Sequence, residues 1–100
     1  MNDLHQGDIL KVEHIKHLVF VASKDFFNTS NMIIGCPIVE RIMPGPLHIW
    51  VSSNDIKGYV LCEELKLLDL SIRGYKKVGN LPIDEIMNIT DAIQGIFDYI

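Results

Sequence analysis

The spacing of apolar residues changes at Pro82, and this change constrains the fold of the chain more than any other feature. After Pro82, isoleucines recur at intervals of three and four residues, as at Ile86, Ile89 and Ile93, which places them on one face of an α-helix. Proline is accepted in a first helical turn, and two acidic residues close behind it complement the positive end of the helix dipole. The pattern predicts an amphipathic C-terminal helix.

Before Pro82 the apolar residues form short runs separated by turn-forming residues, which is typical of strands. Five runs predict strands, and the segment 75–81 predicts a short last one, whereas 67–74 reads as irregular with one possible helical turn. Gly35 and Pro37 suggest a bulge, or a bend near a sheet edge. We expect one mainly β domain over residues 1–100, a small curved sheet or barrel of five to six strands followed by the helix. The five runs are ILKVE (9–13), LVFVAS (18–23), MIIGCPIVE (32–40), LHIWVSS (47–53) and YVLCEEL (59–65).

Composition excludes several other classes of protein. No apolar run approaches the roughly 20 residues that span a bilayer, and the polar N-terminus is unlike a signal peptide, so we expect a soluble, cytoplasmic protein with no membrane partner. Cys36 and Cys62 are far apart in sequence and predict two buried free thiols. No pair of closely spaced cysteines suggests zinc, and we expect neither a metal nor a cofactor.

The net charge of −4 is unevenly distributed. Residues 78–100 contain four acidic side chains and no lysine or arginine, while the rest of the chain balances nine basic against nine acidic residues. A balanced body can present a local basic face, so the acidic total does not exclude a nucleic-acid partner.

Ionisable residues cluster in the connection between the first two predicted strands, at His14, Lys16 and His17. One interpretation is a solvated tight turn. The other is a site for phosphate, because histidines titrate near neutral pH and can supply both an acid and a base, while lysine supplies positive charge.

A second basic cluster, RGYKK, combines Arg73, Lys76 and Lys77 with Tyr75. Cations beside an aromatic ring suit single-stranded nucleic acid, because the cations bind phosphates and the ring stacks on bases. Lysines on an edge strand also prevent pairing between sheets, which is the structural alternative. Arg41, at the end of the third predicted strand, is either a phosphate clamp or part of a solvated edge.

With this order of elements, the chain resembles the MazF/PemK toxins of type II toxin–antitoxin systems. The resemblance extends from Gly7 to the final helix and is carried by GDILKV, LVFVAS, IIGCPIVER and KGYVLCEELKLLDLSIRGYKKVGNLPIDEIMN. It implies an SH3-like barrel, a homodimer, and a metal-independent endoribonuclease that inhibits growth by cleaving single-stranded RNA. It also implies a cognate antitoxin whose extended segment occupies the RNA groove.

The chain departs from the family pattern at the active site. The family usually joins its first two strands by a long loop that ends in Arg-Pro, with the arginine taken as catalytic, whereas here the connection is short and Lys16-His17 stands in that place. Val39 occupies a position that is commonly a hydroxyl residue, while Glu63 keeps an acidic position and Arg73 keeps an arginine. By alternation Glu63 and its neighbour Glu64 face opposite ways, so at most one can line a groove, and the match to the family's acidic position favours Glu63.

We therefore assign candidate roles on the assumption that the site has been remodelled. The alternatives are a barrel that no longer cleaves and binds nucleic acid, RNA or DNA, or a protein partner, and a toxin that binds a protein target such as gyrase. The candidate residues are, for catalysis, Lys16, His17 and Glu63, and, for substrate binding, His14, Arg41, Arg73 and Lys76.

Overall fold

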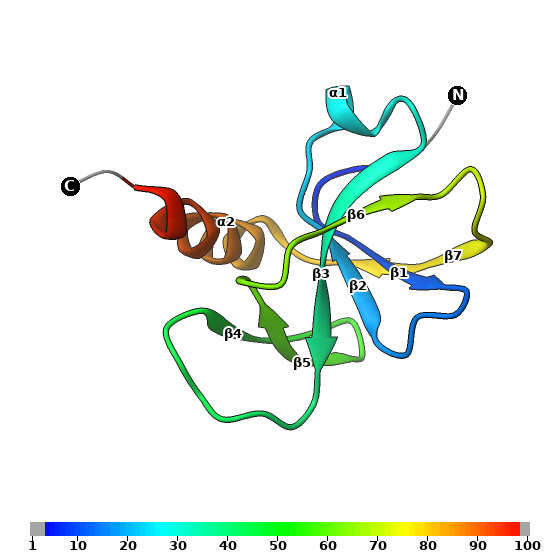
Figure 1. Cartoon of the computed structure of the whole chain (residues 1–100). Helices are drawn as coiled ribbons and strands as arrows, with labels where there is room; N and C mark the ends of the chain where they lie inside the picture. Colours follow the sequence, from blue (N-terminus) through cyan, green and yellow to red (C-terminus); the bar gives the residue numbers. More distant parts are fainter. Residues whose placement is uncertain (1–3, 99–100) are drawn as a thin grey trace.

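The computed structural model describes residues 4–98 and contains seven strands and two helices (Figure 1). The long helix α2 follows the last strand, as the change in apolar spacing predicts. The elements in chain order are β1 (Asp8–Val12), β2 (Leu18–Val21), α1 (Asp25–Asn28), β3 (Met32–Val39), β4 (His48–Ser53), β5 (Ile56–Leu61), β6 (Lys66–Asp69), β7 (Tyr75–Asn80) and α2 (Ile83–Phe97).

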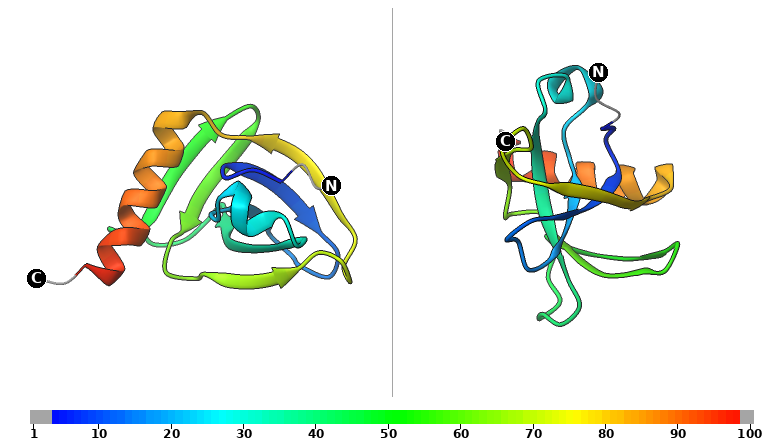
Figure 2. Two further views of the ribbon diagram at one scale, coloured as in Figure 1. Left: turned by 90° about the horizontal axis from the view of Figure 1, so that it is seen from above. Right: turned by 90° about the vertical axis from the view of Figure 1, so that its right-hand side faces the viewer.

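The strands form one antiparallel sheet in the order β4-β5-β3-β2-β1-β7, with β6 paired to β3. The sheet curls strongly, and α2 lies alongside β4 (Figure 2). The predicted class, a small mainly β barrel-like fold with a C-terminal helix, is confirmed. The strand count is seven rather than five to six.

β3 changes partner halfway along its length. Residues 32–35 pair with β6, and Ile38 and Val39 pair with β5. Pro37 falls between these two ladders and is paired only with Val19 of β2, on the other side of the strand. The sequence pattern predicted a bend near a sheet edge, but β3 is an inner strand, so the edge location is wrong.

Two apolar clusters pack on opposite faces of the sheet, because alternate residues of a strand point to opposite sides. On β1, Ile9 belongs to the cluster that α2 covers, whereas Leu10 and Val12 belong to the other. Ile89 of α2 is fully buried against the first cluster. The helix therefore closes one side of the sheet and leaves the ends of the strands open.

The turn between β4 and β5 is shorter than the sequence pattern predicted. Ser53 pairs directly with Ile56, and the two residues between them, Asn54 and Asp55, both have positive φ, of 54° and 67°. This geometry is that of a two-residue hairpin turn, for which asparagine and aspartate are suited. The fifth strand therefore begins at Ile56, not at Tyr59.

Two further local predictions are corrected. Lys66–Asp69 is a strand paired with β3, not a helical turn, because Leu68 and Leu70 bury into the second cluster. The segment Asp25–Asn28 makes one helical turn where only a loop was expected. The side chain of Asn28, at the end of this turn, is buried, and its Nδ2 donates to the carbonyl groups of Leu4 and Ser23.

Cys36 and Cys62 are free and buried, as predicted. Burial raises the pKa of Cys36 to about 12 and that of Cys62 to about 11. Across residues 4–98, no helix combines the length and the apolar character needed to cross a membrane.

Candidate functional site

The connection between β1 and β2 is a tight turn that exposes ionisable side chains. The Ile15 N–H donates to the Val12 carbonyl at 3.1 Å, and His14 has φ of +65°. A non-glycine residue in this region is uncommon, and backbone strain of this kind is concentrated at functional sites. Of the ionisable residues in this connection, His14 and Lys16 are exposed and His17 is half-buried.

Three hollows meet at this turn. The first, which we call the mouth hollow, has a volume of about 500 Å³ and an apolar floor that includes Val19, Pro37 and Leu68. Its polar rim combines the turn with residues from the β5–β6 connection, β6 and the β6–β7 loop. These rim residues are His14, Lys16, His17, Glu64, Lys66 and Arg73.

The second hollow, of about 570 Å³, lies beyond the same turn, toward β5. Lys16 and His17 line it together with Arg41 and Lys57. Lys16 and His17 thus belong to both hollows, with Arg73 on one side and Arg41 on the other. Val39 lines both hollows as well.

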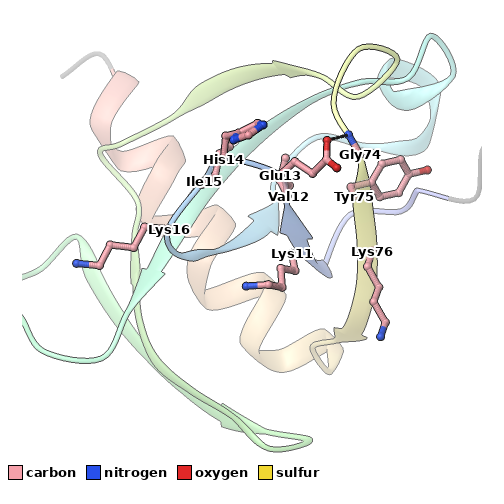
Figure 3. A pocket seen from close by; sticks show the side chains of 9 residues that line it. All are labelled: Lys11, Val12, Glu13, His14, Ile15, Lys16, Gly74, Tyr75 and Lys76. Carbon is pink, nitrogen blue, oxygen red and sulfur yellow. Dashed lines mark hydrogen bonds between the residues drawn. The ribbon is translucent and has the colours of Figure 1, made fainter.

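The third hollow, of about 670 Å³, lies at the outer edge, where β1 meets β7. Figure 3 shows its lining, in which Lys11 and Lys76 extend from neighbouring strands and Lys16 extends away from them. Lys76 is paired with Lys11, and Tyr75 with Val12. Tyr75 and Lys76 therefore point to opposite faces of the sheet, and Tyr75 shares its face with Lys77, so the predicted cluster is divided between the two faces.

A pair of hydrogen bonds joins the turn to the loop that carries Arg73. The Glu13 N–H donates to the Gly74 carbonyl at 2.8 Å, and the Gly74 N–H donates to Glu13 Oε1 at 2.9 Å (Figure 3). A Cβ at Gly74 would lie within 2.9 Å of the Glu13 carboxyl group, so only glycine admits this approach without displacing it. The contact fixes the position of Arg73 relative to the turn.

Glu63 lies apart from the turn and lines none of the three hollows. Its Oε2 is 2.9 Å from His48 Nε2, and His48 Nδ1 is 2.7 Å from the Met43 carbonyl oxygen. Both partners are acceptors, so the imidazole is best satisfied when both nitrogens carry protons. Accordingly, the hydrogen bond to Glu63 raises the pKa of His48, and the same bond lowers the pKa of Glu63.

The cations at the turn have a different environment. Within residues 4–98, Lys16, His17, Arg41 and Arg73 take part in no ion pair within 4 Å. Glu40 and Glu64 line the same hollows but form no ion pair with these groups, which therefore remain available to a polyanion. Across residues 4–98, no three or more His, Cys, Asp or Glu side chains form a group that could hold a metal ion.

The structure thus places four of the seven candidate residues, His14, Lys16, His17 and Arg73, around one hollow. Arg41 and Lys76 each line a neighbouring hollow, and Glu63 lines none of the three. The structure adds members that the sequence did not indicate, namely Lys11, Lys57, Glu64 and Lys66. Glu64 was missed because the family's acidic position favoured Glu63 and alternation was taken to exclude the other glutamate, whereas β5 ends at Leu61 and both glutamates follow it. Lys57 was missed because it was assigned to a turn.

Comparisons with known proteins agree with the fold. Residues 5–97 match the family described as PemK-like, MazF-like toxin of type II toxin–antitoxin system. A MazE–MazF complex from Deinococcus radiodurans (Form-I) contains a chain 16% identical, with a TM-score of 0.86, over 97% of this chain and 98% of that one.

Two mycobacterial structures are also similar. An endoribonuclease from a mycobacterial species is 15% identical, with a TM-score of 0.84, over 97% of this chain and 93% of that one. The Mycobacterium tuberculosis toxin MazF-mt6 is 13% identical, with a TM-score of 0.74, over 93% and 99%. At these identities the structural likeness establishes the fold alone, and no curated protein sequence matches the chain.

Proposed function

The chain belongs to the PemK-like, MazF-like toxins of type II toxin–antitoxin systems, and from that premise we propose that it is an endoribonuclease that cleaves single-stranded RNA without a metal. The observation that carries the proposal is the turn at Lys16 and His17. Both residues line two hollows, lack ion pairs within the described chain, and lie between Arg41 and Arg73.

The chemistry requires one base, one acid and positive charge on the phosphate. In the proposed reaction His17 accepts the proton of the ribose 2′-hydroxyl while the 2′-oxygen forms a bond to the adjacent phosphorus. The bond from phosphorus to the 5′-oxygen breaks, and His14 gives that oxygen a proton. Lys16 and Arg73 stabilise the charge that develops on the phosphate oxygens. The products are a 2′,3′-cyclic phosphate and a free 5′-hydroxyl.

Glu63 has a smaller part in this scheme than the family resemblance suggests. Its carboxylate is held by His48, whereas Glu64 faces the mouth hollow with His17 and Arg73. We propose that Glu63 fixes the β3–β4 loop through His48 and Met43, and that Glu64 is the carboxylate that borders the reaction site.

The proposed partners follow the family. Solved relatives include a MazF chain with MazE and a mycobacterial endoribonuclease in complex with its cognate antitoxin. We propose a cognate antitoxin for this chain, a homodimer, and action in the cytoplasm. An acidic extended segment would satisfy the unpaired cations at the turn by occupying the RNA surface.

The second candidate function is a barrel that binds RNA without cleaving it. The observation that favours it is Val39, which lines both hollows at a position that offers no hydroxyl group. Incubation of a long RNA with the purified protein in EDTA separates the two candidates. Fragments that end in 2′,3′-cyclic phosphate are expected, whereas intact RNA at high protein concentration, with binding retained, would support the second.

A further inference from the structure

Two lysines face each other across the outermost pair of strands. Lys11 of β1 and Lys76 of β7 are direct partners in the antiparallel ladder, and both are exposed. Directly opposed residues of such a ladder have Cα atoms about 4.5–5.5 Å apart, and like charges in these positions repel each other. The pair therefore destabilises the edge of the sheet in the free protein.

Within the described chain, residues 4–98, neither Lys11 nor Lys76 forms an ion pair within 4 Å. Glu13 also lines the outer hollow, where its carboxylate accepts from the Gly74 N–H, and it reduces the repulsion only from beyond contact distance. The arrangement contrasts with the next lysine along β7, Lys77, whose Nζ lies 3.1 Å from the buried carboxylate of Asp8.

The outer hollow is also continuous with the proposed scission site. His14 and Lys16 line both the outer hollow and the mouth hollow. Lys76, Lys11 and Lys16 therefore line connected hollows, with their ammonium groups pointing in different directions (Figure 3). A chain of phosphates fits such spread charges better than a single small anion, since successive phosphates can be neutralised by different lysines.

We propose that Lys11 and Lys76 bind one backbone phosphate of single-stranded RNA, outside the bond that is cut. This inference rests on the proposed function, because it takes the mouth hollow as the place of scission. The site would read no base, since lysines contact the phosphate as point charges. It would hold the strand in register for the turn.

The test is a binding titration of the Lys11→Gln/Lys76→Gln variant. The probe is a fluorescently labelled single-stranded RNA of about 20 nucleotides, fully 2′-O-methylated so that it cannot be cleaved, in EDTA. We expect Kd to rise about tenfold near 100 mM KCl. The negative slope of log association constant against log [KCl] should become shallower by about 0.7, the value for one phosphate contact on a single strand. An unchanged Kd and slope would overturn the proposal.

The exposed Lys24 supplies a matched control, since it lies beside α1 and lines none of the three hollows. The single variants Lys11→Gln and Lys76→Gln should each raise Kd, whereas Lys24→Gln, which removes the same charge as either, should leave Kd within twofold of wild type and the salt slope unchanged. A loss equal to that of Lys11→Gln would show a general charge effect and overturn the site. The double variant should melt at or above the wild-type temperature, and a lower value would contradict the repulsion argument.

Cleavage kinetics separate this proposal from the proposed function. With a cleavable RNA, the double variant should show a raised KM and a kcat within twofold of wild type. If wild-type protein leaves RNA intact while the double variant still binds more weakly, the scission proposal fails and the phosphate site stands. If wild-type protein cleaves and the double variant binds normally, the phosphate site fails and the scission proposal stands.

Discussion

Two histidine-containing regions of the molecule show opposite states of their ionisable groups. His48 has a hydrogen-bond acceptor at each ring nitrogen, and one of these acceptors is the Glu63 carboxylate. At the β1–β2 turn, His17 and Lys16 have no ion-pair partner within residues 4–98 and border two hollows. The family resemblance grouped Glu63 with the turn, whereas the structure places it in the satisfied pair.

The difference indicates how structural and reactive groups can be distinguished in the free protein. A charged side chain whose hydrogen bonds are complete stabilises the fold locally and has little capacity left for a ligand. A cationic side chain that has no partner and lies beside a cavity does not stabilise the fold, and it remains available to bind an anion. The predictions below test this distinction, from the largest effect to the smallest.

Replacing both residues of the turn, as Lys16→Ala/His17→Ala, should have the largest effect. We expect kcat/KM for RNA cleavage to fall by about 10²–10⁴, the usual contribution of a positioned acid or base and its neighbouring charge. The free energy of unfolding should change by less than about 0.5 kcal/mol, because neither side chain makes an ion pair.

The pair Lys24 and His5 provides the control for that experiment. Both are exposed and line a separate hollow beside α1. Lys24→Ala/His5→Ala should cleave RNA at the wild-type rate. Cleavage that survived the Lys16 and His17 changes would end the assignment of the turn as the reactive region.

The link between the turn and Arg73 can be tested at Glu13. Glu13→Ala removes the side-chain acceptor for the Gly74 N–H and keeps the backbone bond to the Gly74 carbonyl, so Arg73 is held less firmly. We expect kcat to fall about tenfold, since small displacements at a reaction centre have large effects. Glu13→Gln keeps a carbonyl oxygen at the same place and should restore most of the rate. Equal rates for the two variants would show that the contact does not position Arg73.

A hydroxyl group introduced at residue 39, which lines both hollows, should increase the rate of cleavage. Val39→Thr adds a donor where the structure has only methyl groups, and one new hydrogen bond to the phosphate, worth about 1 kcal/mol, corresponds to about a fivefold gain in kcat. Val39→Ala is the control for the change in volume, and it should not increase the rate. A threonine variant no faster than wild type would show that substrate does not approach residue 39.

The smallest effect on cleavage is expected for the satisfied pair. Glu63→Gln should leave kcat/KM within about twofold and should lower the melting temperature by a few degrees, because His48 loses a charged acceptor. Loss of cleavage without a change in melting temperature would reverse the comparison and make Glu63 the catalytic carboxylate.

The same pair predicts how stability depends on pH. A histidine with a raised pKa stabilises the fold below its ordinary value of 6.5 and loses this effect as the pH rises through the raised value. A carboxyl group with a lowered pKa stabilises above its ordinary value of 4.5 and loses this effect as the pH falls through the lowered value. The difference in melting temperature between wild type and Glu63→Gln should therefore be largest between pH 4.5 and 6.5 and should shrink toward pH 8.

Sequence patterns predicted the elements that depend on local spacing. The helix after Pro82 and the apolar run of β2 are visible in the order of residues alone. β6 was missed because the adjacent Leu67 and Leu68 hide its alternation, and its burial depends on β3, more than 30 residues earlier. Long-range pairing of this kind leaves little trace in a short window of sequence.

The candidate site was predictable to a similar degree. The crowding of His14, Lys16 and His17 in one short connection indicated the turn directly. The separation of Glu63 was not predictable, because it depends on where β5 ends and on which partner His48 reaches. Glu63 and His48 are 15 residues apart in the sequence, and neither residue indicates that the other is its partner.

The two buried thiols have a consequence for experiments on ligands. The thiolate is the form that reacts with alkylating reagents, and burial of Cys36 and Cys62 holds both groups protonated at neutral pH. Alkylation therefore proceeds only through molecules whose core has opened. Any RNA or antitoxin that binds the folded form alone will slow that labelling in proportion to its occupancy. The unmodified chain can thus report, by mass, which molecules it binds.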